Sequence, residues 1–334
     1  MLEPKGPHPR LATTPPPPRT GARTTAATPR RRPAQTVPEI DLTATVVGPT
    51  AGEAISLALR ATIERLVEQM ALVKLAAGPE AIHQARVATR RLRSDLRTFE
   101  VLFDADALAT VRRELGWLGD LLGAVRDADI LQARLGPSLD AGEPNDDQKQ
   151  ILGQLSRQKS RAQMDLLTAM NEARYAALVD SVTRLAKDPP LSDVAGAPAD
   201  EFLPMIVKGT WRKLSRAVKK LDKHPDDARL HAVRIEAKRC RYAAEAAAPA
   251  VGLDAARFAE AVSALQQTLG DFNDAVVSAA WLTDASSQMS PSTAFLAGAL
   301  HEAQNGLARK ARRRWPAAWK QLDQKKMHGW LDVA

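Results

Sequence analysis

Apolar residues recur at helical spacing through almost all of the chain after about residue 50. Short breaks rich in Gly and Pro interrupt this pattern, and Gly78-Pro79 and Gly136-Pro137 are the clearest of them. The pattern predicts helices at Ile55–Ala77, Glu80–Phe103, Asp106–Leu135, about 147–171, 173–187, 199–222, 226–248, 253–285 and 290–323. Long helices joined by short loops favour an all-α fold built from antiparallel bundles.

A longer break divides the helical region into two halves. Residues 188–198 combine several prolines with a glycine and carry no helical pattern. We therefore expect one domain over residues 50–325, with a first four-helix bundle at about 50–187 and a second at about 198–325. A short C-terminal tail is predicted at 326–334.

Residues 1–49 differ from the rest in composition and show neither helical nor strand periodicity. They hold 11 of the 22 prolines, and seven basic residues against three acidic ones. Such a segment has too little apolar surface to fold, so a disordered Pro/Arg-rich tail is predicted. Its role stays open between a plain linker and an auxiliary arm that binds anions or docks on a protein.

The composition supports a helical fold and gives the chain a net positive charge. Hydrophobic residues make up 45% of the chain, which is enough for a sizeable core, whereas aromatic residues make up only 4%. Lys and Arg number 47 against 39 Asp and Glu, which gives a net charge of +8. A basic excess indicates a polyanionic partner, such as nucleic acid, an anionic membrane surface or a phosphate polymer.

Other features of the chain bear on its compartment. Cys240 is the single cysteine, so no disulfide can form within the chain. No run of about 18 apolar residues could span a bilayer, and the N-terminus lacks the apolar segment of a secretory signal. These features predict a cytoplasmic protein that does not insert into membranes.

The basic residues follow an internal repeat. His83, Arg86, Arg90, Arg91 and Arg93 stand at the same offsets as His231, Arg234, Lys238, Arg239 and Arg241, with a shift of 148. A second match follows in each half, where Leu122-Gly123 and Asp127-Ala128 correspond to Leu269-Gly270 and Asp274-Ala275 with a shift of 147. Two ordered matches indicate duplication, and so two similar bundles related by a pseudo-two-fold axis.

Helical geometry places these basic residues on one face of each helix. His83, Arg86, Arg90, Arg93 and Arg97 fall within an arc of roughly 80°, since an α-helix turns about 100° per residue. We call these five the first basic face, and His231, Arg234, Lys238 and Arg241 the second basic face. Leu92, Leu96, Phe99 and Phe103 fall on the side opposite the first face, and Val233, Cys240 and Ala244 lie behind the second, which makes Cys240 a predicted core residue.

The repeated basic faces favour anion binding over a merely solvated surface. Solvated helix faces usually mix charges, because like pairs at i,i+4 destabilise a helix by about 0.2–0.5 kcal/mol each. Arginine suits phosphate because its planar fork can bind two oxygens at once. Other basic positions could widen such a surface, although solvent-facing charge explains them equally well. They are Lys208, Arg212, Arg216, Lys219, Lys223 and the run from Arg309 to Arg314, which includes Arg313.

The histidines and aspartates leave alternatives open. His83 and His231 are interpreted as additional cations, with a packed neutral imidazole or a catalytic role as the other options. No metal-ligand spacing or paired nucleophile and base occurs, so no metal site and no catalytic residue are predicted. Asp127, Asp129, Asp271 and Asp274 would hold neighbouring arginines in position, or would bind Mg²⁺ or Ca²⁺ that bridges to phosphate.

Four segments give the chain a specific resemblance. "HQARVATRRLRSDLRTF", "LGWLGDLLGAVRDADIL", "LHAVRIEAKRCRYAAE" and "LQQTLGDFNDAVV" are similar to the signature segments of the CHAD family, the histidine α-helical domains often found beside CYTH triphosphatase domains. The resemblance covers roughly residues 50–325 and implies two pseudo-symmetric four-helix bundles with a basic central groove. It also implies binding of inorganic polyphosphate and association with polyphosphate granules. No CYTH-like segment of alternating glutamates precedes the domain, so triphosphatase activity is not carried over.

The expected function is therefore non-enzymatic polyphosphate binding by multivalent charge neutralisation. The positions that the resemblance assigns to ligand contact are His83, Arg86, Arg90, Arg91, Arg93, His231, Arg234, Lys238, Arg239 and Arg241. The first rival is a nucleic-acid-binding protein, for which Trp211, Trp315 and Trp319 could stack bases. The second rival is a phosphohydrolase or kinase acting on polyphosphate, although the chain has no GxxxxGK[ST] motif. Nucleic acid is expected to bind only nonspecifically, and the sequence leaves the oligomeric state open.

Overall fold

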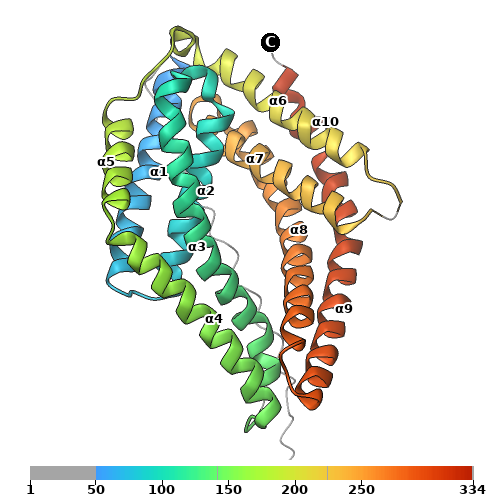
Figure 1. Ribbon diagram of the computed structural model, residues 1–334. Helices are drawn as coiled ribbons and strands as arrows, with labels where there is room; N and C mark the ends of the chain where they lie inside the picture. The colour runs from blue at the N-terminus through green and yellow to red at the C-terminus, as the bar shows by residue number, and fades with distance from the viewer. Residues whose placement is uncertain (1–49, 141, 224, 333–334) are drawn as a thin grey trace, which may run out of the picture. The chain divides into compact units, whose positions relative to one another are not determined.

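The computed structural model describes residues 50–140, 142–223 and 225–332, all of which belong to one compact unit (Figure 1). The predicted tail at 1–49 lies outside the described residues. The described part of the chain consists of α-helices and short 3₁₀ turns, with two isolated β-bridges in place of any strand. The expected all-α fold class is thus confirmed.

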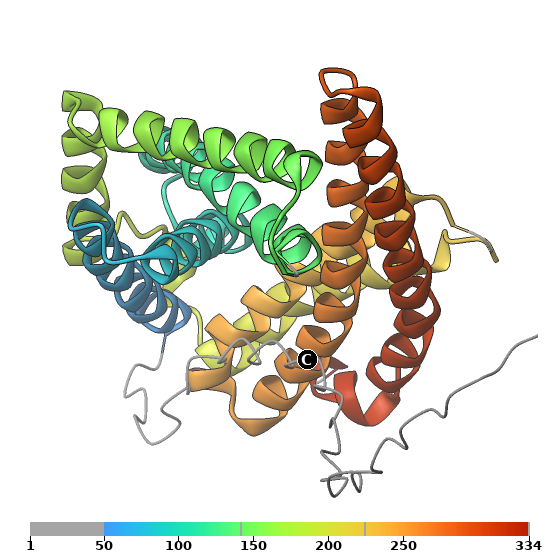
Figure 2. The same ribbon diagram turned by 90° about the horizontal axis from the view of Figure 1, so that it is seen from below.

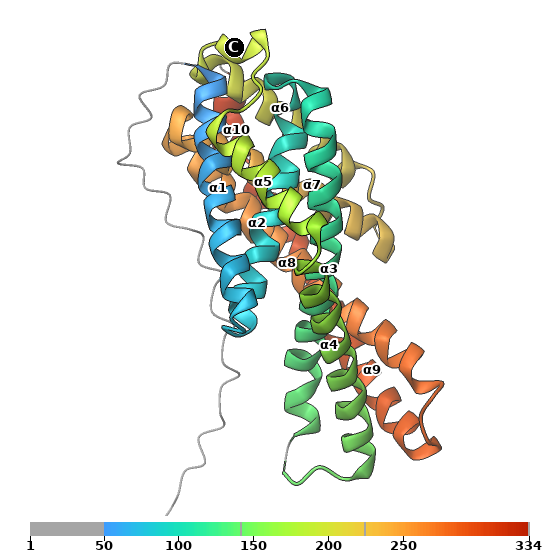
Figure 3. The same ribbon diagram turned by 60° about the vertical axis from the view of Figure 1, so that its left-hand side comes forward.

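The first half contains five α-helices. They are α1 (Ala51–Lys74), α2 (Pro79–Thr98), α3 (Ala105–Leu139), α4 (Asp146–Met170) and α5 (Ala173–Lys187), with the 3₁₀ turn η1 (Glu100–Leu102) between α2 and α3. Consecutive helices pack on one another from α1 to α4, and α5 returns to contact α1, α3 and α4 (Figure 3).

The second half repeats the first four helices. They are α6 (Ala199–Lys219), α7 (Asp227–Val251), α8 (Leu253–Ser286) and α9 (Pro291–Leu322). The turn η2 (Asp193–Gly196) precedes them, and α10 (Lys325–His328) and η3 (Gly329–Asp332) follow. Again each helix packs on the next from α6 to α9.

The halves are joined in a way that reveals their symmetry. Each of the first four helices contacts its own counterpart, in the pairs α1–α6, α2–α7, α3–α8 and α4–α9 (Figure 1). Like elements meet each other only near a two-fold axis, so the contacts agree with the duplication that the sequence predicts. The α2–α7 pair therefore brings the two basic faces to the same region of the fold.

Two separate groups of buried side chains hold the halves together. The larger core runs through α1, α2, α3, α6, α7 and α8 and includes Leu92, Leu96 and Phe99, all of which are fully buried. The smaller core joins the ends of the α3–α4 and α8–α9 hairpins through Leu135, Ile151 and their neighbours (Figure 2). Burial of apolar surface at both places, at about 25 cal/mol per Å², stabilises the contact between the halves.

Helix α3 extends beyond the predicted stop. The sequence pattern ended it at Leu135 because Gly136-Pro137 follows, but the helix continues to Leu139 with Pro137 inside it. A proline in the last turn removes one backbone hydrogen bond, and Leu135 and Leu139 are both fully buried there. Packing in the smaller core thus offsets the local cost of the proline.

The linker between the halves and the described residues after α9 also form helical turns. The linker at 188–198 includes η2, which packs on the start of α1, where the backbone NH of Ala51 donates to the carbonyl of Ala197 at 2.8 Å. The segment predicted as a C-terminal tail instead forms α10 and η3 up to Asp332, and η3 packs against α6. None of the helices among the described residues is long and apolar enough to cross a membrane.

Candidate functional site

Helix α2 carries the first basic face. Its N-cap is Gly78, whose φ of 99° suits glycine, and Pro79 occupies the first helical position, where its missing NH costs nothing. The apolar side of the helix, including Leu92 and Leu96, is buried as the periodicity predicted. The opposite side carries the basic residues, and there α2 contacts α7.

Four cations from the two basic faces come together between α2 and α7. Arg86 and Arg90 of α2 are close enough to Arg234 and Lys238 of α7 to lower the pKa of both. These four residues, here called the central basic cluster, are the two pairs that the repeat predicted, since Arg86 corresponds to Arg234 and Arg90 to Lys238. The structure thus brings these four repeated positions together, and ligand contact by them stays a prediction.

Two carboxylates that are also related by the repeat border this cluster. Asp127 of α3 lies 3.4 Å from the guanidinium of Arg86 (Oδ1 to Nη2). Asp274 of α8 is close enough to Arg234 and Lys238 to offset part of the lowering of their pKa that burial causes. Burial raises the pKa of Asp127 above its usual value, and the nearby Asp274 adds to this effect. Two negative charges thus face four basic groups.

Partial burial lowers the pKa of basic groups in the cluster. Burial is the largest cause that lowers the pKa of Arg86 and of Arg234. It also lowers the pKa of Lys238 to about 6, with further contributions from Arg90, Arg234 and Arg86. Reduced hydration strengthens the repulsion among the cations, and the same conditions strengthen their attraction to an incoming anion.

Two residues that the sequence did not single out as site residues position the cluster. Tyr242 is 1% exposed and accepts a hydrogen bond from Nε of Arg90 to its hydroxyl at 2.9 Å. Gly123 of α3 lets the Arg86 guanidinium approach so closely that a Cβ there would overlap it. Gly123 was visible as half of a repeated Leu-Gly pair, but Tyr242 corresponds to Ser94 and gave no repeat signal.

Arg91 and Arg241 occupy a different environment from the central basic cluster. Both arginines form ion pairs with the carboxylate of Glu245, at 2.9 Å from Nη1 of Arg91 and at 3.0 Å from Nε of Arg241. Asp95 lies 3.7 Å from Nε of Arg91 and is 1% exposed. Burial raises the pKa of Asp95 to about 8, with a further contribution from Glu245. This network, which we call the buried ion-pair network, joins α2 to α7 through the pair of Arg91 and Glu245.

The other predicted ligand positions on α2 and α7 differ in exposure and in their partners. His231 is exposed and its Nδ1 lies 2.7 Å from Oδ1 of Asn273, whereas His83 is half-buried. Arg239 pairs with Glu236 at 2.6 Å. Arg93 is exposed with its guanidinium over Gly119 of α3, and Arg97 is exposed at the end of α2.

The wider basic positions do not form one arrangement. Lys208 pairs with Asp332 of the C-terminal segment at 3.0 Å, whereas Arg212, Lys219 and Arg313 are exposed. Within the run at 309–314, Arg312 pairs with Asp227, and other arginines of the run pair with acidic side chains as well. Much of this charge is therefore neutralised within the fold.

The aspartates whose role the sequence left open are close to basic groups. Asp127 contacts Arg86, Asp129 pairs with Lys159 at 2.9 Å, and Asp271 pairs with Arg314 at 2.9 Å. Among the residues that the structure describes, no three His, Cys, Asp or Glu side chains are grouped as metal ligands would be.

The aromatic residues and the cysteine are used for packing. Trp211 is 8% exposed and stacks against both Trp319 and His328, with centroid distances of 5.3 and 5.0 Å. Its faces are therefore occupied, which weakens the case for base stacking. Cys240 is fully buried as predicted, and burial raises the pKa of its thiol to about 12.

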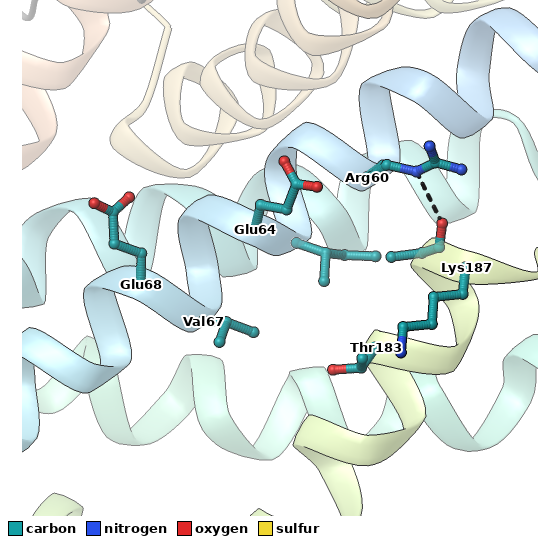
Figure 4. Close-up of a pocket in the computed structure, with 8 residues that line it drawn as sticks. Arg60, Glu64, Val67, Glu68, Thr183 and Lys187 are labelled. Atoms are coloured by element: carbon teal, nitrogen blue, oxygen red, sulfur yellow. Dashed lines mark hydrogen bonds between the residues drawn. The ribbon is translucent and has the colours of Figure 1, made fainter.

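A cavity of about 680 Å³ lies between α1 and α5. Its walls combine Val67 and Ile63 with the charged side chains of Glu64, Glu68 and Lys187 (Figure 4). The lining residues share none of the repeated positions, so this cavity is separate from the residues of the central basic cluster.

Comparisons with known proteins agree with the architecture. A family model described as "CHAD domain" matches residues 57–283. Two proteins of Mycobacterium tuberculosis, "Uncharacterized protein Rv2226" and "Uncharacterized protein MT2285", are 32% and 31% identical to the chain over 259 residues. The alignments cover 73% of this chain and 48% of each of those proteins, so the chain spans about half the length of these curated relatives.

Solved structures give the same result. PptA from Streptomyces chartreusis superposes with a TM-score of 0.69 at 26% identity, over 81% of this chain and 99% of that one. The CHAD domain from the plant Ricinus communis superposes with a TM-score of 0.61 at 25% identity, over 85% of this chain and 92% of that one.

Proposed function

The chain belongs to the CHAD family, and on that premise we propose that it binds inorganic polyphosphate at the central basic cluster and does not catalyse a reaction on it. The observation that carries the proposal is the meeting of two repeated basic faces at α2–α7 in partly buried surroundings. Four basic groups against two carboxylates leave an excess of positive charge at this place. A phosphate polymer supplies the missing negative charges at close intervals.

The proposed contacts follow from the geometry of the cluster. Arg86 and Arg234 offer planar forks to phosphate oxygens, and Arg90 is held in place by Tyr242. The 3.4 Å separation of Arg86 from Asp127 is longer than a good charge-assisted hydrogen bond, so a phosphate oxygen competes well for this guanidinium.

The remaining basic residues are assigned by their surroundings. His83, His231, Arg93 and Arg97 extend the binding surface along the two faces. Arg91 and Arg241 hold the helices together through Glu245 and are left out of the contact set, and Arg239 is engaged by Glu236. The exposed Arg212, Lys219 and Arg313, together with Lys208, would contact only a chain that reaches beyond the cluster. Accumulation on cytoplasmic polyphosphate granules would follow from such binding.

A filter-binding competition tests the proposal. Long-chain polyphosphate, duplex DNA and single-stranded RNA would compete for the full chain at matched charge and salt. We expect polyphosphate to win, because duplex DNA presents its bases in grooves that need an element shaped to enter them. Equal or better binding of DNA would contradict the proposal. Incubation with Mg²⁺ should release no orthophosphate, and release that the His83→Ala variant abolishes would establish an enzyme instead.

A charge-reversed pair of variants localises the binding. Arg90→Glu with Lys238→Glu should weaken polyphosphate binding at least about tenfold, since a charged hydrogen-bond partner is worth about 1.5–3 kcal/mol. The matched control is Arg157→Glu with Arg161→Glu, which makes the same charge change at exposed positions of α4. Circular dichroism would show equal helix content in both. Equal loss of binding in the two would place the binding outside the cluster.

A divalent cation could still take part through Asp127 and Asp274. Hard cations prefer carboxylate oxygens, and a bridging Mg²⁺ would join these aspartates to phosphate. Binding measured with Mg²⁺ and with EDTA distinguishes this arrangement from direct contact. Direct contact by the cluster predicts that EDTA leaves the affinity at its Mg²⁺ value or raises it.

A further inference from the structure

We propose that polyphosphate leaves the central basic cluster along α2 and not along α7, over a second phosphate subsite that Arg93 and Arg97 form. The inference rests on the proposed function and concerns the path of the polymer over that same site. It stands on a break in the repeat, because the second half fills the corresponding place with a carboxylate of its own.

In the second half, this place is neutralised within the protein. Arg241 is 8% exposed, and its Nη1 donates to Oγ of Ser263 on α8 at 3.1 Å. Its Nε lies 3.0 Å from Oε1 of Glu245, one turn further along α7, and Glu245 is itself buried. Because this arginine is buried and its charge is balanced by a carboxylate of its own helix, no external anion can take that place.

The first half has the same arginine without the carboxylate. Arg93 stands at the offset of Arg241, with the shift of 148. Arg97 stands at the offset of Glu245 with the same shift, so a second cation replaces the acid. Both Arg93 and Arg97 are exposed, which leaves their guanidinium groups open to a ligand.

The guanidinium of Arg93 lies against the backbone of α3. A Cβ added at Gly119 would be 3.1 Å from its Nη1, and one added at Gly116 would be 3.7 Å from its Nη2. Gly116 is the counterpart of Ser263 with the shift of 147, so Arg93 and Arg241 reach equivalent places on α3 and α8. The two glycines leave room for the flat guanidinium, which is therefore partly positioned before a phosphate arrives.

No carboxylate of the described ranges takes over the part of Glu245 in the first half. Among the ion pairs within those ranges, none includes Arg93 or Arg97, and Glu100, which follows α2, pairs with Arg112 at 2.8 Å. Two like charges at i and i+4 repel each other on a helix. A phosphate group between the two guanidinium groups removes this repulsion and binds to their planar forks.

The two helices therefore continue the site differently. Seven residues separate Arg90 from Arg97, which is about 10 Å along the helix axis. A polymer with a negative charge on each phosphate can cover the central basic cluster and then follow Arg93 and Arg97 toward the end of α2. On α7 the row of available cations ends at Lys238 in this direction, because Arg241 is already paired.

The salt dependence of binding counts the cations that the polymer neutralises. Arg93→Gln with Arg97→Gln would be compared with wild type in filter binding of long-chain polyphosphate at several salt concentrations. Each neutralised phosphate contributes about 0.7–0.9 to the slope of log affinity against log salt, so we expect the slope to become shallower by about 1.5. The affinity should fall at least about tenfold.

The matched control is Arg157→Gln with Arg161→Gln, which removes the same charge at exposed positions of α4 and should keep the wild-type slope. An unchanged slope without Arg93 and Arg97, or an equal change in the control, would overturn the inference and leave the proposed function intact. Absence of binding by the wild type would overturn both.

Arg97→Glu gives the first half the acid that the second half already has. The new carboxylate should pair with Arg93, as Glu245 pairs with Arg241. In this background Arg93→Gln should leave the polyphosphate affinity unchanged, whereas the same substitution in the wild type should weaken binding several-fold. Circular dichroism should show wild-type helix content, since both positions are exposed. Equal losses from Arg93→Gln in the two backgrounds would show that no phosphate occupies this place and would overturn the inference.

Discussion

The Asp95→Asn substitution tests the buried ion-pair network that fastens α2 to α7. Asp95 is 1% exposed, and burial raises the pKa of its carboxyl to about 8. In the unfolded chain an aspartate ionises near about 3.9. Between these pH values the folded protein holds one proton more than the unfolded chain, so its free energy of unfolding falls as the pH rises. An asparagine side chain does not ionise, so the free energy of unfolding of the variant does not fall with pH for this reason.

The expected gain follows from the interval between the two pKa values. Between about pH 3.9 and pH 7, the free energy of unfolding of the wild type falls by about 1.4 kcal/mol for each of about three pH units. Asp95→Asn should therefore stabilise the protein by up to about 4 kcal/mol at pH 7 and by almost nothing near pH 4. Arg91 does not lose its main partner, because Glu245 lies 2.9 Å away.

Urea unfolding followed by circular dichroism from pH 4 to pH 8 measures the difference. Asp129→Asn is the matched control, because this buried aspartate has an ion pair with Lys159 at 2.9 Å. Loss of this ion pair in Asp129→Asn should destabilise the protein by about 1–3 kcal/mol at pH 7. If Asp95→Asn were also destabilising at pH 7, its carboxyl would be ionised and would contribute through Arg91, and the argument from burial would be wrong.

Three further expectations concern the site and the core. Gly123→Ala should displace the Arg86 guanidinium and weaken polyphosphate binding about tenfold. Gly270→Ala, with no atom within 4 Å of the added Cβ, should leave binding unchanged. Equal effects of the two variants in filter binding would contradict this role for Gly123. Cys240 should react with a thiol reagent at pH 8 only as fast as the protein unfolds, and rapid labelling of the folded protein would show that it is not core. The logarithm of the polyphosphate affinity should fall with the logarithm of the salt concentration with a slope of about −3 or steeper, since four cations neutralise phosphates; a flat response would exclude charge neutralisation.

The fold could be predicted because its signals are local. Helix periodicity and the Gly-Pro breaks lie within short windows of sequence, the repeat is a direct match of two short segments, and the structure confirms the helices that these signals predict. The differences lie at helix ends: α2 stops at Thr98 and gives way to η1 before the predicted end at Phe103, and α10 forms where a tail was predicted. Helix α3 continues past its predicted end because burial of Leu139 in the smaller core outweighs Pro137. Tertiary packing of this kind has no local signature.

The site could be predicted only in part for the same reason. The repeat identified Arg86, Arg90, Arg234 and Lys238, but it could not distinguish them from Arg91 and Arg241, which point to Glu245. One residue along a helix turns the side chain by about 100°, so Arg91 reaches the buried carboxylate of Glu245 whereas Arg90 lies in the central basic cluster. Glu245 has Arg97 as its counterpart in the first half, so the duplication concealed this partner.

The pairing of each helix with its own counterpart has a consequence for the direction of the ligand. A linear polyphosphate chain is identical when read from either end, whereas a nucleic acid strand has distinct 5′ and 3′ ends. Cations arranged about a two-fold axis meet a chain that enters from either side in nearly the same order. For the proposed ligand, both directions of entry therefore give the same complex, whereas a nucleic acid strand would form two different complexes.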